Sequence, residues 1–174
     1  LKAKKAAQKH GLDAKVFDMA DADMATLSKA KNLIVYAATH GEGDPPARAA
    51  DFYHALMSDA APRLDGVKYA VLALGDTAYV QFCETGKRID ARLQALGATR
   101  ASDRADCDLD FSKQAIAWTE AALGKLAPAD TGSGATIVHV DFKGGGALSE
   151  DDDEPRFTAE HPLEAEISAL VNLN

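Results

Sequence analysis

Short apolar runs alternate along the chain with longer segments in which apolar residues recur every three or four positions. Two runs, Leu33–Ala37 and Tyr69–Ala73, are apolar throughout, which is typical of parallel strands covered on both faces. Lys15–Asp18 is a third strand candidate, and residues 24–30 lead into the run at Leu33. The pattern therefore predicts a sheet of buried parallel strands.

Helices are expected between these strands. Residues 1–10 are predicted to be helical, with Gly11 as the C-terminal cap. Pro45 and Pro46 suit the start of the next helix, where a missing N–H costs nothing. The inward face of that helix carries three apolar residues, Phe52, Leu56 and Met57.

Two further helices are predicted over about 86–96, stopping at Gly97, and over about 111–126. The residues expected to be buried on them are Ile89, Leu93, Leu96, Ile116, Leu123 and Leu126, with Trp118 at the edge of the second helix. Strand and helix thus alternate, which predicts an α/β fold with a doubly wound parallel sheet. Between the two helices, 98–101 is a possible short strand and the acidic stretch 103–110 is expected to be a solvated turn.

The composition changes after Leu126. Residues 127–156 are rich in Gly, Ser, Pro and acidic residues and are predicted to be a flexible linker with a lone strand at 136–140. The last segment, 157–174, partly alternates over 163–171, as a half-exposed antiparallel strand does. Since a single strand is not stable alone, the sequence predicts a first domain over 1–126 and the start of a second at 157–174.

The amino terminus is also unusual, because the chain opens with a helix that has no strand before it. A doubly wound sheet begins with a strand, so we expect this sheet to lack its first strand. The chain is accordingly expected to be truncated at its amino end.

The formal net charge of −8 argues against nucleic-acid binding, which needs a basic face. It suits either an acidic rim that meets a basic partner or solubility alone. No apolar stretch is long enough for a membrane span, and no apolar segment follows the basic start as in a signal peptide. Cys83 and Cys107 lack metal-site spacing, so we expect two reduced thiols in a cytoplasmic protein.

The candidate chemistry lies in two loops, residues 39–46 and 74–83, each directly after a predicted parallel strand. Open α/β sheets bind ligands at the carboxyl ends of their strands. Gly41 and Gly43 allow backbone to approach a ligand closely, and Tyr79 is placed to stack on a ring. The loops therefore favour a pocket for a flat ring with polar edges, such as a flavin.

Several carboxylates accompany these loops: Glu42, Asp44, Asp76 and either Asp106 or Asp108. They would disfavour extra negative charge on a reduced flavin and so lower its reduction potential. Each feature has a simpler interpretation. Asp76 is equally suited to cap the following helix. His40 is more typical of a solvated loop residue than of a base or ligand, and Tyr79 taken alone is more typical of a surface aromatic than of a stacking residue. The combination at two successive strand ends is what favours a ligand site.

Other chemistries lack their motifs. The sequence has no phosphate-binding loop of the Gly-x-x-x-x-Gly-Lys-Ser/Thr type, and no Gly-x-Gly-x-x-Gly between a strand and a helix. It has no nucleophile elbow and no paired His or Cys set for zinc. We predict neither a catalytic residue nor a metal ligand.

The loops at 39–46 and 74–83, with the pattern Gly-Asp-Thr-x-Tyr-x-x-Phe-Cys at 75–83, resemble the FMN-binding domain of diflavin reductases. That pattern and the stretch 103–108 favour the sulfite reductase [NADPH] flavoprotein family among them. Residues 1–126 are similar to its flavodoxin-like domain, and 157–174 to the linker and first strand of its ferredoxin-reductase-like FAD module.

The resemblance implies which residues contact FMN. On this basis the cofactor-binding residues are Ala38, Thr39, His40, Gly41, Leu74, Gly75, Asp76, Thr77, Ala78, Tyr79, Val80, Gln81, Phe82 and Cys83. It further implies that FAD and NADPH bind to a carboxyl-terminal part outside this sequence. Electrons would pass from NADPH through FAD and FMN to the haemoprotein (beta) subunit, which reduces sulfite to sulfide for cysteine biosynthesis. The intact protein would be an oligomer.

Two departures from the family pattern stand out. The loop that holds the FMN phosphate, and the strand before it, would precede Leu1, and nothing in residues 1–30 replaces them. His40 stands where near relatives usually carry Gln. Two alternative functions stay open: the FMN domain of a diflavin reductase serving a haem monooxygenase or an iron acceptor, and a non-catalytic flavodoxin-like docking module.

Overall fold

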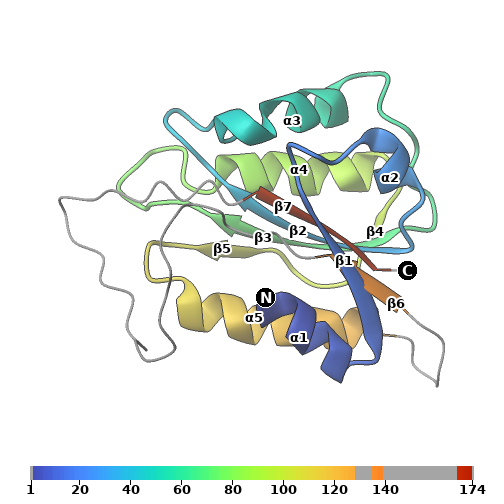
Figure 1. Ribbon diagram of the computed structural model, residues 1–174. Coiled ribbons are helices and arrows are strands. Elements are labelled where there is room, and N and C mark those ends of the chain that lie inside the picture. The colour runs from blue at the N-terminus through green and yellow to red at the C-terminus, as the bar shows by residue number, and fades with distance from the viewer. Residues whose placement is uncertain (1, 128–134, 139–167, 174) are drawn as a thin grey trace.

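A sheet of seven strands separates two layers of helices in the computed structural model, which describes residues 2–127, 135–138 and 168–173 (Figure 1). The strands are β1 (Leu12–Asp18), β2 (Asn32–Ala38), β3 (Lys68–Leu74), β4 (Thr99–Arg100), β5 (Ala105–Cys107), β6 (Ala135–Val138) and β7 (Ser168–Leu173). The helices are α1 (Lys2–Lys9), α2 (Met24–Ser28), the short 3-10 helix η1 (Ala47–Ala49), α3 (Ala50–Met57), α4 (Glu84–Ala95) and α5 (Ser112–Leu126).

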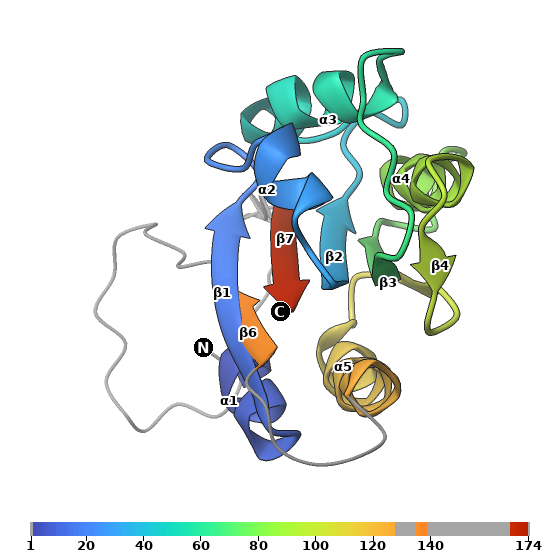
Figure 2. The ribbon, with the colours of Figure 1, turned by 90° about the vertical axis from the view of Figure 1, so that its right-hand side faces the viewer.

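The strand order is β4-β3-β2-β7-β1-β6, and β5 pairs with β3 as well. Helices α2, α3 and α4 cover one face of the sheet, and α1 and α5 cover the other (Figures 1 and 2). This is the doubly wound α/β arrangement that the alternation of strands and helices predicts.

Strand β2 shows why the apolar runs are continuous. Leu33 and Val35 pack into the cluster beneath α3 and α4, whereas Ile34 packs into the cluster beneath α1 and α5. Because successive side chains of a strand point to opposite faces, a strand covered on both faces needs apolar residues at every position. The sequence prediction for this strand is confirmed.

Strand β7 lies between β1 and β2 and is antiparallel to both (Figure 2). All other pairings of the described strands are parallel. Its ladder with β2 is unbroken from Asn32↔Leu173 to Ala37↔Ser168. Its ladder with β1 is interrupted between Ala14 and Phe17, next to the register shift of β1 against β6 at Lys15. Strand β7 therefore pairs with β2 over a longer unbroken stretch than with β1.

Two expectations about strands need correction. The acidic stretch 103–110 is not only a turn, because β5 pairs with β3 in parallel; Ala105 and Cys107 are buried on either side of the partly exposed Asp106. The strand expected at 136–140 is not alone: it is described as β6 and pairs with β1. The strand expected at 163–171 is described over Ser168–Leu173 and is antiparallel, as predicted.

The helices agree with expectation except in two respects: α2 is not predicted, because residues 24–30 are expected only to lead into the next strand, and Ile116 is 49% exposed and not buried. The first turns of α5 pack through Phe111, Ala115 and Trp118, and Ile116 follows Ala115 around the helix toward solvent. Leu123 and Leu126 are buried as predicted. The positions expected in the linker at 128–134 and 139–156, and those at 157–167, lie outside the described residues. None of the helices in the described part of the chain is long and apolar enough to cross a membrane.

Candidate functional site

Two loops leave the carboxyl ends of β2 and β3 side by side. The last residues of these strands, Ala38 and Leu74, are paired in register, and the Thr39 amide donates a hydrogen bond to the Leu74 carbonyl oxygen over 3.0 Å. The two predicted loops therefore meet at one edge of the sheet. Ala38 and Leu74 themselves are buried, so only their backbone can face a ligand.

The first loop is a tight turn between His40 and Asp44. Each of these residues donates its amide to the other's carbonyl oxygen, over 2.8 and 2.9 Å. Gly41 and Gly43 have φ angles of +48° and +102°, a region that glycine occupies without strain. A Cβ built on Gly41 would meet nothing within 4 Å, whereas one on Gly43 would lie 3.2 Å from the Gln81 Cβ. The turn is thus open at Gly41 and packed against the second loop at Gly43.

Thr85, near the start of α4, fastens the first loop to that helix. Its amide donates to the Thr39 hydroxyl oxygen over 3.1 Å, and its own hydroxyl donates to the Gly43 carbonyl oxygen over 3.2 Å. Thr85 is buried. Thr39 is one of the residues predicted to contact a cofactor. In the structure its hydroxyl oxygen also accepts a hydrogen bond from the first turn of α4.

The second loop is tightly packed where it begins. The Gly75 amide donates to the Cys107 carbonyl oxygen over 3.0 Å, and a Cβ on Gly75 would lie only 2.7 Å from the Cys83 amide nitrogen. Asp76 does not cap α4, since Cys83 occupies the N-cap position. The Asp76 carboxylate accepts instead from the Ala78 amide over 2.8 Å.

The tip of the second loop is open to solvent. Tyr79 is 58% exposed and Val80 is 98% exposed, although both are large apolar residues. Thr77 and Ala78 are exposed too, and Gln81 and Phe82 are partly buried. An exposed aromatic at the carboxyl edge of a parallel sheet is a surface that a planar ligand can cover.

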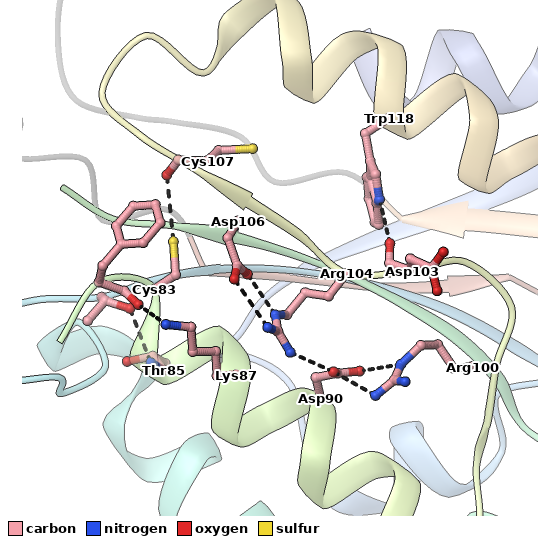
Figure 3. A network of polar contacts seen from close by, with 12 residues as sticks. Cys83, Thr85, Lys87, Asp90, Arg100, Asp103, Arg104, Asp106, Cys107 and Trp118 are labelled. Atoms are coloured by element: carbon pink, nitrogen blue, oxygen red, sulfur yellow. Dashed lines mark hydrogen bonds and ion pairs between the residues drawn. The ribbon is translucent and has the colours of Figure 1, made fainter. Parts of the chain in front are cut away.

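The base of this loop is held by Lys87 and by two buried cysteines (Figure 3). The Lys87 ammonium donates to the Phe82 carbonyl oxygen over 2.6 Å and lies 5.6 Å from the centre of the Phe82 ring. The Cys83 thiol donates to the Cys107 carbonyl oxygen over 3.6 Å, and the Cys107 sulfur points away from it. Burial raises the pKa of the Cys83 thiol to about 12 and also raises that of Cys107. Both are free, unreactive thiols.

A third segment, directly after β5, contacts the second loop through Asp108. Its carboxylate accepts from the Thr77 hydroxyl over 2.5 Å and from the Thr77 amide over 3.2 Å. The hydrogen bond from the Thr77 hydroxyl holds the pKa of Asp108 below its ordinary value. The sequence marked Asp108 only as one of several carboxylates, because nothing in the spacing of two residues 31 positions apart reveals this contact.

Asp106 differs from Asp108, because Arg104 neutralises its charge (Figure 3). Arg104 binds Asp106 over 2.6 Å and also reaches the buried Asp90 over 2.8 Å. Arg100 binds the same Asp90 carboxylate over 2.7 Å. The expectation that Asp106 repels charge on a ligand is therefore weakened, and Asp108 is the carboxylate that lies on the loop.

The loops can be tested for their fit to a flavin. The amides of Gly41 and Asp76, one in each loop, donate to no acceptor among the described residues. Free amides suit the carbonyl oxygens and ring nitrogens along the pyrimidine edge, and the exposed Tyr79 suits the face of the ring. The residues present therefore fit the ring portion of a flavin.

Similarity to known proteins extends along most of the chain. The family model for flavodoxin matches residues 2–156. The sulfite reductase [NADPH] flavoprotein alpha-component of Bacillus subtilis (strain 168) is 38% identical over 172 residues, covering 99% of this chain and 27% of the relative. The same component of Cronobacter sakazakii is 39% identical over 160 residues, covering 90% and 26%. The chain thus spans about a quarter of the length of these relatives.

Solved structures show the same fold. The flavodoxin of Streptococcus pneumonia TIGR4 superposes with a TM-score of 0.65 at 29% identity, covering 72% of this chain and 85% of that protein. Oxidised Flavodoxin 1 from Bacillus cereus gives a TM-score of 0.64 at 21% identity, covering 75% and 87%. The structure therefore shares its fold with these flavodoxins.

Proposed function

Because this chain belongs to the flavodoxin family, we propose that its two loops bind the ring of FMN and that it transfers electrons through that cofactor. Bound FMN supplies the redox chemistry. Residues Ala38–Gly41, at the end of β2 and the start of the first loop, lie along one edge of the ring, and the second loop, Leu74–Cys83, covers a face. The observation that carries the proposal is the exposed Tyr79, at a sheet edge where both loops present free amides.

The chain's own residues bind and orient the ring. The amides of Gly41 and Asp76 donate hydrogen bonds to its polar edge, and Tyr79 excludes water from one face. Thr85 keeps the first loop in place through Thr39 and Gly43. The ionised Asp108 opposes additional negative charge nearby, which favours the oxidised cofactor.

We propose further that the FMN phosphate is held by residues outside these 174. This proposal rests on the family resemblance, in which a phosphate loop and its strand come before the helix that here is α1. It is supported by the position of β7, which fills the centre of the sheet in antiparallel orientation. It is also consistent with the relatives, which are about four times as long as the segment matched here.

The names of those relatives suggest the wider role. We propose that the intact protein is the flavoprotein component of an NADPH-dependent sulfite reductase, with 127–156 as a linker and 157–174 as the start of an FAD module. Electrons would pass from NADPH through FAD and FMN to a haemoprotein subunit, in an oligomer that serves cysteine biosynthesis. The free thiols Cys83 and Cys107 are typical of a reducing compartment such as the cytoplasm.

Titration of the chain with FMN, followed by flavin fluorescence, tests the ring site. We expect Tyr79→Ala to weaken binding about tenfold, since aromatic stacking contributes about 0.5–1.5 kcal/mol beyond burial. The matched control is Ile116→Ala, which removes another exposed apolar side chain, on α5. Equal affinities for both variants and the unchanged chain would contradict the proposed site.

The acceptor is tested separately. Reconstitution of the full-length flavoprotein with a sulfite-reducing haemoprotein should give NADPH-dependent sulfide formation. Reduction of a monooxygenase haem or an iron acceptor in place of sulfite would favour the other diflavin reductases. A protein that binds such a partner but no flavin would favour the non-catalytic docking module.

A further inference from the structure

We propose that Asp108 is a positioning residue of the second loop: by holding Thr77, it sets the place from which Tyr79 meets the flavin ring. The inference rests on the proposed function, but the contact on which it depends is a property of the chain itself. It assigns to the segment after β5 a part in the site that neither loop supplies.

The contact is made at two points. The Thr77 hydroxyl donates to one oxygen of the Asp108 carboxylate over 2.5 Å, and the Thr77 amide donates to the other over 3.2 Å. The Leu109 amide also donates to this carboxylate, over 2.8 Å, which fixes its orientation. Hydrogen bonds to an ionised acceptor are stronger than neutral ones, and the low pKa of Asp108 is consistent with them.

The second loop has few other attachments. Within it, Asp76 accepts from the amides of Ala78 and Tyr79, which folds the loop on itself without fixing it to the protein. Among the described residues, the hydrogen bonds from Thr77 to Asp108 are the only ones that tie residues 76–80 to another segment. Without Asp108, the remaining attachments to other segments would lie outside residues 76–80, at the Gly75 amide before them and at the Phe82 carbonyl oxygen after them.

Asp108 is well placed for this role because β5 is part of the sheet. Cys107, its neighbour, pairs in register with Leu74, the last residue of β3. Asp108 therefore leaves the sheet beside the second loop, where it binds Thr77, two residues before Tyr79 in the chain. Asp106, two residues before Asp108, cannot substitute, because it is bound to Arg104.

A purely structural contact would affect stability alone, whereas a positioning residue affects how the flavin is held. The test uses the 174-residue chain with riboflavin and FMN as probes. The variants are Asp108→Ala, Thr77→Val and Thr77→Ser, with Asp110→Ala as control; Asp110 is exposed and makes no hydrogen bond with the described residues. The readouts are the flavin dissociation constant and the quenching of bound flavin by Tyr79.

We expect Asp108→Ala and Thr77→Val to weaken flavin binding about 3- to 10-fold, the range for one lost hydrogen bond to a charged group near the surface. Both should also brighten the bound flavin. Thr77→Ser, which keeps the hydroxyl, should restore both values, and Asp110→Ala should change neither. In a Tyr79→Ala background, Asp108→Ala should have no further effect on quenching.

Two results would overturn the inference: unchanged flavin binding and quenching in Asp108→Ala, or an equal brightening when Tyr79 is already absent. Hydrogen exchange of the amides of residues 77–80 in the flavin-free chain adds an independent readout. Faster exchange in Asp108→Ala is expected, and unchanged exchange would also overturn the inference. If the unaltered chain binds no flavin, the proposed function fails, while this exchange measurement still decides the role of Asp108.

Discussion

Gly86 of α4 packs directly on Ala73 of β3, so closely that a Cβ on the glycine would overlap the alanine side chain. This contact fixes the distance between α4 and the sheet. Because Thr85 is its neighbour in the chain, the contact also places the hydrogen bonds that hold the first loop.

Gly86→Ala should lower the free energy of unfolding by about 1–2 kcal/mol. Overpacking costs about 1–3 kcal/mol, and alanine regains up to about 1 kcal/mol in a helix. The control is Gly124→Ala in α5, where a Cβ would lie 3.7 Å from the His10 ring, an ordinary contact. Urea denaturation should show Gly124→Ala to be neutral or stabilising; a stable Gly86→Ala chain would show that α4 can shift.

Gly75→Ala should abolish binding of the flavin ring, and its effect on the stability of the fold should be smaller. The added Cβ would lie 2.7 Å from the Cys83 amide nitrogen, so the backbone of the second loop must move. Flavin titration of Gly75→Ala, with its circular dichroism compared to that of the unaltered chain, separates the two effects. Flavin affinity at the unaltered level would mean that the loop is not part of the site.

The thiol of Cys83 should resist alkylation in the folded chain at pH 8, because burial raises its pKa to about 12. The unfolded thiol ionises near its ordinary value, so it should react once the chain is denatured. The raised pKa also gives the pH dependence its sign: stability is unaffected below about pH 9 and falls as the pH rises toward 12. Rapid labelling of Cys83 by iodoacetamide without denaturant would contradict this burial.

Arg104→Gln should lower the reduction potential of the bound flavin, because it leaves Asp106 without the arginine that neutralises it. Arg100→Gln is the matched control, since Arg100 binds Asp90 and not Asp106. Potentiometric titration of both flavin-loaded variants gives the comparison. Equal potentials would place Asp106 too far from the ring to matter.

The sequence predicts the strands that are buried on both faces, because β2 and β3 carry apolar residues at every position after their first. It does not reveal β5, since the charge of Asp106 conceals the buried pair Ala105 and Cys107. The partner strands of β6 and β7 are equally hidden, because pairing depends on contacts between distant parts of the chain and not on local pattern.

The site likewise has features that the sequence predicts and features that it does not. The ends of β2 and β3 reveal where the loops lie, and Tyr79 is exposed as a stacking residue should be. The contacts that fix the loops, from the Thr85 amide to the Thr39 hydroxyl and from Thr77 to Asp108, join residues 46 and 31 positions apart. Only the folded chain brings these polar groups within hydrogen-bonding distance.

The most direct test of the account compares FMN with riboflavin, which has the same ring but no phosphate, on the 174-residue chain. If these residues hold the ring and others hold the phosphate, both flavins should bind with affinities within about threefold, and Tyr79→Ala should weaken both equally. FMN binding more than about tenfold tighter than riboflavin would show that this chain has a phosphate site of its own. Binding of neither flavin would contradict the ring site itself.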